Sequence, residues 1–222
     1  MLDKLYPYRF KVFFFSQVSL LFSSLVVPAT LHEGVISPIL LFVNLAAGVL
    51  FTAKKKRVFW FLITLFIITV AIVSFSLLEG MDKRATDLVR MGTAFLFYAI
   101  VSLEIIKQVW SAVSVNGNVI LGLISGYLSL GLIGSFICTS IEIINPGSFK
   151  GLSVDPNLLN VELNYYSYIT LLTIGYGDIV PVTNLARTTS VLIGLMGQMY
   201  IVIITAVVVG KYINQSASEI IE

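Results

Sequence analysis

Long apolar stretches alternate with short polar ones along most of the chain. A membrane-spanning helix needs about 20 mostly apolar residues. Six stretches qualify, with approximate bounds 11–28, 34–53, 58–78, 91–110, 119–144 and 185–211. A seventh stretch, 161–172, is too short to span and predicts a re-entrant helix. The pattern therefore predicts an all-α membrane protein with six transmembrane helices and one helix that enters the membrane and turns back.

The composition excludes most other classes of protein. Residues of the AVILMFWYC set make up 57% of the 222 residues and charged residues only 12%, about half the charge of a soluble domain. Disorder, a collagen-like fibre and a disulfide scaffold are excluded. The single cysteine, Cys138, cannot form an internal disulfide, and the single histidine, His32, excludes a His-based metal cluster within one chain. A formal charge of +2 is too small to indicate nucleic-acid binding.

The placement of lysine and arginine predicts the orientation in the membrane. If the N-terminus is cytoplasmic, nine basic residues face the cytoplasm and five face outside. Four of the nine form the run 54–57, in a tight loop where the rule is most reliable. We expect a multi-pass protein of the plasma or inner membrane with both termini cytoplasmic. The first apolar segment could instead be a signal peptide, because Val27-Pro28-Ala29 is a passable cleavage site.

Candidate chemistry lies between the last two predicted spans. Residues 173–177 contain two glycines separated by one residue. This pattern ends a helix and permits backbone conformations that are closed to other residues. Non-helical backbone at membrane depth is tolerated only where it is buried or lines a watery cavity. Alternating left- and right-handed conformations turn successive carbonyls to one side, and such neutral oxygen dipoles suit a hard cation of low charge. One short strand cannot surround an ion, but copies arranged in a ring can.

The segment 173–178, Thr-Ile-Gly-Tyr-Gly-Asp, resembles the selectivity filter of tetrameric potassium channels. The run 165–167, Tyr-Tyr-Ser, resembles the start of the family's pore helix, and Pro181 and Arg187 follow the filter as they do in the family. The resemblance covers roughly residues 119–211. It implies a four-fold symmetric homotetramer in the lipid bilayer that conducts K⁺ passively, with K⁺ as the permeant ion and no organic cofactor.

The resemblance also implies roles for single residues. K⁺ would be coordinated by the carbonyls of Thr173, Ile174, Gly175 and Tyr176 and by the Thr173 hydroxyl, while Gly177 would let the chain turn at the outer mouth. The half-negative C-terminal end of the pore helix would favour a cation on the axis.

Support for the filter is expected from Asp178 and Tyr166. Gly197 falls where the family often has a hinge glycine in the inner helix, although a close-packed contact between helices is an equally open interpretation. The sequence departs from the family pattern at Leu172, where many members have a second threonine, and at Ile169, where some have a carboxylate behind the filter.

This resemblance predicts that the chain is divided into two domains. Residues 1–115 are expected to form a four-helix transmembrane scaffold resembling an uncharged sensor-like domain. Residues 116–222 are expected to form the pore domain, with a loop at 145–160 and a short cytoplasmic tail. Only eleven residues follow Lys211, so we expect no cytosolic ligand-binding domain, while an unknown regulatory subunit or ligand stays open.

The fourth predicted span lacks the charges of a voltage sensor. Such a sensor carries basic residues at every third position, and residues 91–106 contain no lysine or arginine. We therefore expect no steep voltage gating, and the gating stimulus is left open. In the same span, Glu104 is a functional candidate because it is an intramembrane acid, but pairing at the interface, close to Lys107, or reaching the interface is favoured.

Other functions are less well supported. No Ser/His/Asp arrangement or metal-ligand spacing favours an enzyme. A secondary transporter usually shows paired interruptions in two halves of the chain, and here one is apparent. A non-conducting accessory subunit and a non-selective cation channel are further alternatives. Relatives that lose selectivity tend to alter the tyrosine found here as Tyr176.

Overall fold

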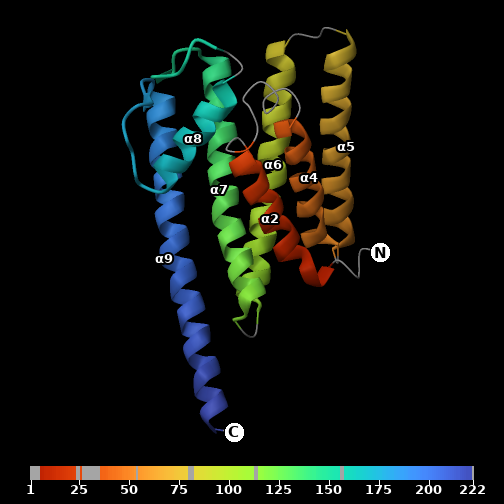
Figure 1. Ribbon diagram of the computed structural model, residues 1–222, viewed down its shortest axis with the longest axis vertical. Helices are drawn as coiled ribbons and strands as arrows, with labels where there is room; N and C mark the ends of the chain where they lie inside the picture. The colour runs from red at the N-terminus through yellow and green to blue at the C-terminus, as the bar shows by residue number, and fades with distance from the viewer. Residues whose placement is uncertain are drawn as a thin grey trace.

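The computed structural model is predominantly helical (Figure 1). It describes residues 6–23, 26, 36–53, 55–79, 83–112, 115–155 and 158–221. The helices are η1 (Tyr6–Tyr8), α2 (Arg9–Phe22), α4 (Ser37–Val49), η4 (Leu50–Thr52), α5 (Lys56–Glu79), α6 (Lys83–Trp110), α7 (Gly117–Ile144), α8 (Leu159–Leu171) and α9 (Asn184–Ile221). Two short strands, β1 (Phe149–Lys150) and β2 (Val180–Pro181), pair antiparallel.

The long helices lie side by side, with α5 at one edge of the bundle and α9 at the other (Figure 1). Helix α7 is the central element, because it contacts α2, α6, α8 and α9. The short helix α8 lies between α7 and α9. The loops that follow η4 and α6 lie at the same end of the bundle, and the C-terminus extends beyond that end. The α7–α8 loop lies at the opposite end.

Three helical segments in the described part of the chain are long and apolar enough to cross a membrane: Arg84–Trp110, Gly117–Ile144 and Asn184–Ile213. A shorter apolar helix covers Ile39–Thr52. Helix α2 has 14 residues, or about 21 Å at 1.5 Å per residue, which is less than the ~30 Å hydrocarbon core. The expected cleavage site at 27–29 and His32 lie outside the described residues.

Two helices extend past the apolar stretches that predicted them. Helix α6 begins at Lys83 rather than near 91, and Arg90 pairs with Asp87 at 3.0 Å one turn away. Helix α9 continues to Ile221, beyond the expected end near 211. Hydropathy marks where a helix is apolar. It does not mark where polar residues continue the same helix through local pairs.

Buried polar side chains connect the helices of the main core. Asn44 accepts a hydrogen bond from Tyr98 and donates one to Ser16 at 2.7 Å. Gln17, which is fully buried, donates to Ser129 of α7 at 2.8 Å. Without water in a bilayer, such groups must find partners inside the protein, so these contacts link α2, α4, α6 and α7.

Charged groups tie the scaffold together at the end of the bundle near the chain's C-terminus. Glu104 lies 2.6 Å from Lys55 and 3.8 Å from Lys107. The predicted pairing of Glu104 is therefore confirmed, with Lys55 as the closer partner. The ammonium of Lys211 on α9 donates to the carbonyls of Trp110 and Ala112 at 2.5 and 2.7 Å. This contact joins the end of α6 to α9.

Candidate functional site

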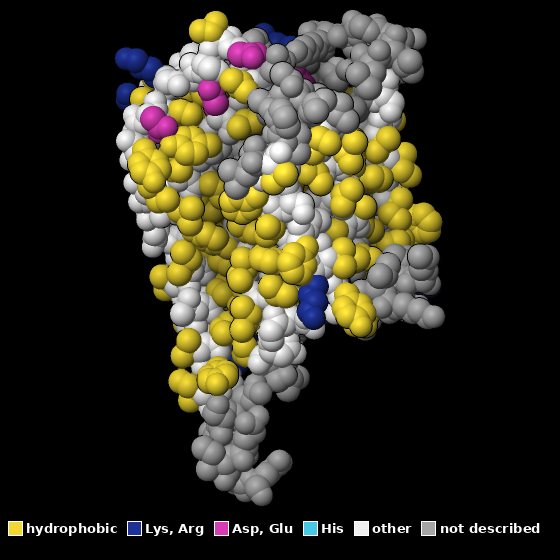
Figure 2. All heavy atoms as spheres, viewed as in Figure 1, with side chains coloured by type: hydrophobic (Ala, Val, Ile, Leu, Met, Phe, Trp, Pro, Cys, Tyr) yellow, Lys and Arg dark blue, Asp and Glu magenta, His cyan; other side chains and the backbone are white. Residues whose placement is uncertain are grey.

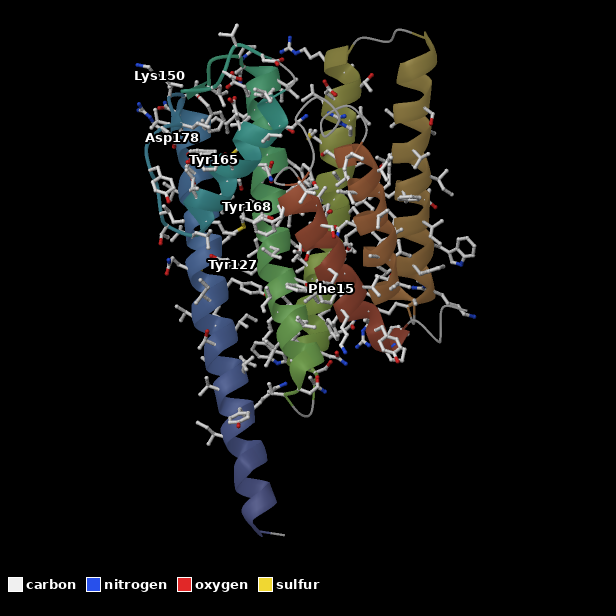
Figure 3. The ribbon with its side chains drawn as sticks, viewed as in Figure 1. Phe15, Tyr127, Lys150, Tyr165, Tyr168 and Asp178 are labelled. Carbon is white, nitrogen blue, oxygen red and sulfur yellow. The ribbon has the colours of Figure 1, made fainter. Side chains whose placement is uncertain are left out.

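Helix α8 is fixed against α7 by hydroxyl groups. Ser167 donates to the carbonyl of Gly131 at 2.7 Å, and Tyr168 donates to the carbonyl of Leu128 at 2.6 Å. A side chain at Gly131 would collide with the Tyr168 ring. Glycine on α7 therefore makes room for the aromatic group that holds α8, and Figure 3 shows Tyr168 between the two helices.

The C-terminal end of α8 is held from two sides. Tyr127 of α7 donates to the carbonyl of Leu171 at 3.2 Å. A Cβ added at Gly197 of α9 would lie 2.5 Å from the same carbonyl oxygen and 2.9 Å from the Leu171 Cδ1. Gly197 therefore lets α9 approach the end of α8. This contact fits the packing interpretation of that glycine, and α9 continues as one helix through it.

The backbone changes conformation directly after α8. The φ angles are +57° at Thr173, +57° at Gly175 and +81° at Gly177. Among described non-glycine residues, Thr173 alone has a positive φ. Left-handed residues thus occupy every second position from 173 to 177, the alternation expected from the sequence. The intervening Ile174 and Tyr176 have no positive φ. With this alternation, successive carbonyls can face the same side.

The amides at the start of this segment point back toward α8. The amide of Thr173 donates to the carbonyl of Thr170 at 3.0 Å. Those of Ile174 and Gly175 donate to the carbonyl of Ile169 at 2.9 and 3.3 Å. In the described part of the chain, no hydrogen bond ends on the carbonyls of 173–176. These oxygens are therefore available to a ligand, and the partially negative end of α8 lies next to them.

Asp178 closes the segment at the end near the α7–α8 loop. Its carboxylate accepts a hydrogen bond from the Tyr165 hydroxyl at 2.8 Å, and this bond lowers the pKa of Asp178. Figure 3 shows the two side chains close together. The Tyr166 hydroxyl lies 2.5 Å from Ser190 of α9 instead. The expected support residue Tyr166 therefore contacts α9, and its neighbour Tyr165 contacts Asp178.

The contacts made by the Tyr165 and Tyr127 hydroxyls were not predicted from the sequence. Tyr165 belongs to the aromatic pair that resembled a pore-helix start, but one sequence does not tell which ring of the pair faces Asp178. Tyr127 lies among apolar residues of the predicted fifth span. A tyrosine in the middle of a span was the available signal, because its hydroxyl needs a partner there.

Residues 157–214 match a family model described as "Ion channel". The matched region includes α8, the 173–178 segment and most of α9, about a quarter of the chain. No curated protein and no solved structure matches the chain. The match supports an ion-channel domain at the site described above. Together with the apolar helices, the match indicates a membrane protein.

Proposed function

We propose that the chain is one subunit of a potassium-selective channel in which the carbonyls of 173–176 and the Thr173 hydroxyl replace the water around K⁺. The observation that carries this proposal is the left-handed conformation at alternating residues, 173, 175 and 177. That alternation supports a row of carbonyls on one side of the segment. The amides at its start are already used by α8.

The chemistry of the segment favours a monovalent cation. Residues 172–177 carry no charged side chain, so the ligands are neutral dipoles whose total charge does not demand a divalent ion. Rings of backbone carbonyls are a known means of replacing a K⁺ hydration shell. Gly177 then lets the chain turn away at the outer mouth.

A ring of four copies would complete the ion path. In the single chain, Tyr176 is 72% exposed and Ile174 is 49% exposed. Free carbonyls cannot face lipid, so the segment must line a water-filled space or be covered by another part of the assembly. The apolar part of α9 is also open, with 11% of its most apolar window buried against 61% for α7. A closed ring of identical chains would cover both surfaces, and four is the number that the filter resemblance implies.

The remaining helices would complete six spans per subunit. Residues 55–57, three members of the basic run, lie at the same end of the bundle as the extended C-terminus, which supports cytoplasmic termini. Acidic and basic side chains both gather near the opposite end, and apolar side chains form a broad band below them (Figure 2). This distribution suits a protein surrounded by lipid.

Ion flux from liposomes containing the purified protein tests this function. We expect K⁺ to pass at least tenfold faster than Na⁺. Gly175→Ala should abolish that difference or the flux itself, because the strain of a side chain at a φ of +57° falls within the row of carbonyls that binds the ion. Gly147→Ala is the matched control: its φ is also positive, +87°, and nothing lies near the added methyl. Equal passage of Na⁺ and K⁺ in the unmutated protein would refute selectivity, and absence of flux would refute conduction.

A further inference from the structure

The loop between α7 and α8 contacts the chain directly behind the 173–178 segment. Its strand β1 pairs with β2, with Phe149 opposite Pro181 and Lys150 opposite Val180. The amide of Val182 also donates to the carbonyl of a loop residue, Ser148, at 2.8 Å. Figure 3 shows Lys150 near Asp178 at this end of the molecule. The sequence predicted only an irregular loop here.

The loop is itself anchored on two helices. The Glu142 carboxylate of α7 accepts hydrogen bonds from the amide of Phe149 at 3.0 Å and from that of Gly147 at 2.6 Å. The Phe149 ring is 4% exposed and packs on Tyr166 of α8, with ring centroids 5.1 Å apart. The residues just before Gly151 are therefore fixed relative to the pore-helix region.

Gly151 makes the closest approach to the back of the segment. Its φ is +99°, and an added Cβ would lie well inside contact distance of the Asp178 carbonyl oxygen. The same Cβ would be 3.0 Å from the Asp178 carbonyl carbon and 3.2 Å from the Ile179 Cα. All three atoms belong to the backbone, so a side chain at 151 can be accommodated only if the Asp178 peptide moves or the loop detaches.

We propose that Gly151 is a positioning residue for the outer end of the ion path, an inference that rests on the proposed function. The anchored loop sets the position of the Asp178 peptide through Gly151. The Asp178 peptide joins the Gly177–Asp178 peptide at the Asp178 Cα, so displacing it moves the chain beside Gly177 and, through that residue, the carbonyl of Tyr176. The loop thereby stabilises the arrangement of carbonyls that binds the cation.

The loop contains a matched control for this proposal. Gly147 and Gly151 both have positive φ, +87° and +99°, but only Gly151 has backbone within 4 Å of the added Cβ. In liposomes, we expect Gly151→Ala to lower K⁺ flux at least tenfold or to make it decay at least tenfold faster. Gly147→Ala should remain within about threefold of the unmutated protein. Equal effects of the two substitutions would overturn the proposal.

Raising the external K⁺ concentration separates a positioning defect from a general folding defect. An ion that binds only the ordered carbonyls shifts the equilibrium toward that form by mass action. The flux of Gly151→Ala relative to the unmutated protein should therefore recover at least threefold at high K⁺. A deficit that does not change with K⁺ would show a merely structural role and would contradict the proposal.

Hydrogen exchange tests the same contact without relying on conduction. We expect Gly151→Ala to speed amide exchange in 175–180 at least fivefold and to leave α7 and α9 unchanged, whereas Gly147→Ala leaves 175–180 unchanged. If Gly151→Ala does not assemble, Phe149→Leu keeps an apolar side chain while removing the ring contact with Tyr166, and the same exchange increase is expected. Unchanged exchange would overturn the proposal, whereas an unmutated protein without flux would refute only the proposed function.

Discussion

Single residues determine the conformation of the 173–178 segment and its support. Thr173 adopts a left-handed φ of +57° although it is β-branched, which costs about 1–2 kcal/mol. The hydrogen bond from its amide to Thr170, and those from the next two amides to Ile169, help to offset this cost. At the other end of the segment, the Tyr165 hydroxyl donates a hydrogen bond that holds the Asp178 carboxylate in place.

The Tyr165–Asp178 hydrogen bond predicts a dependence on acid. The bond lowers the pKa of Asp178 in the folded protein, so its contribution is present above the unfolded pKa, near 4, and is lost as the pH falls through the lower folded value. We expect Tyr165→Phe to raise the pKa of Asp178, measured by NMR titration with a labelled aspartate. Tyr166→Phe, which removes the contact with Ser190, should leave it unchanged. An unchanged pKa in Tyr165→Phe would contradict this assignment.

The role of Gly197 can be decided by a stability measurement. Gly197→Ala places a methyl 2.5 Å from the Leu171 carbonyl oxygen, so we expect overpacking to destabilise the protein by about 1–3 kcal/mol. Gly194→Ala is the control, because nothing lies within 4 Å of its added Cβ. Thermal unfolding in detergent measures both. If Gly197→Ala alters gating while stability is unchanged, the hinge interpretation is favoured over packing.

Helix α6, the predicted fourth span, lacks the regularly spaced charges of a voltage sensor. Its basic residues lie near its two ends, and Arg90 is paired with Asp87. Since moving one charge through 100 mV yields about 2.3 kcal/mol, an apolar helix has little to respond with. We expect open probability in planar bilayers to change less than about threefold between −100 and +100 mV. Steep voltage activation would show that another element senses the field.

Helix α6 is also joined by an ion pair to Lys55, the residue before α5. The Glu104 side chain is 6% exposed, and Lys55 is its closer partner. Lys55→Met should destabilise the protein by about 2 kcal/mol, since it leaves a largely buried carboxylate without its main charged hydrogen bond. Lys107→Met should cost less than about 0.5 kcal/mol, because that lysine is 65% exposed and 3.8 Å away. Equal losses in thermal unfolding would contradict the ranking.

The sequence predicted some elements well and others poorly, for physical reasons. The apolar lengths located the long helices, and the paired glycines located the end of α8 to within a residue. The β1–β2 pairing could not be predicted, because strands of two residues carry no periodicity and depend on the contact between Phe149 and Tyr166. Which of the two tyrosines, Tyr165 or Tyr166, contacts Asp178 depends on the rotation of α8 about its axis, which packing on α7 and α9 determines.

The whole molecule leaves exposed, in a single chain, the two surfaces that a channel would turn toward its ion path or toward neighbouring subunits. The segment 173–178 and the apolar part of α9 are open in the single chain, while α7 is largely buried. Lipid can cover α9, but it cannot satisfy free carbonyls. An assembly around an axis resolves both, and the division into a scaffold (1–115) and a pore domain (116–222) stays a prediction of the same kind.

A cryo-electron microscopy map of the purified protein in lipid nanodiscs with K⁺ would show whether the 173–178 segments of several chains line one ion path. We predict four copies around one axis, with ion density between the rings of carbonyls from 173–176. A single chain, or a ring in which this segment faces away from the axis, would contradict the account.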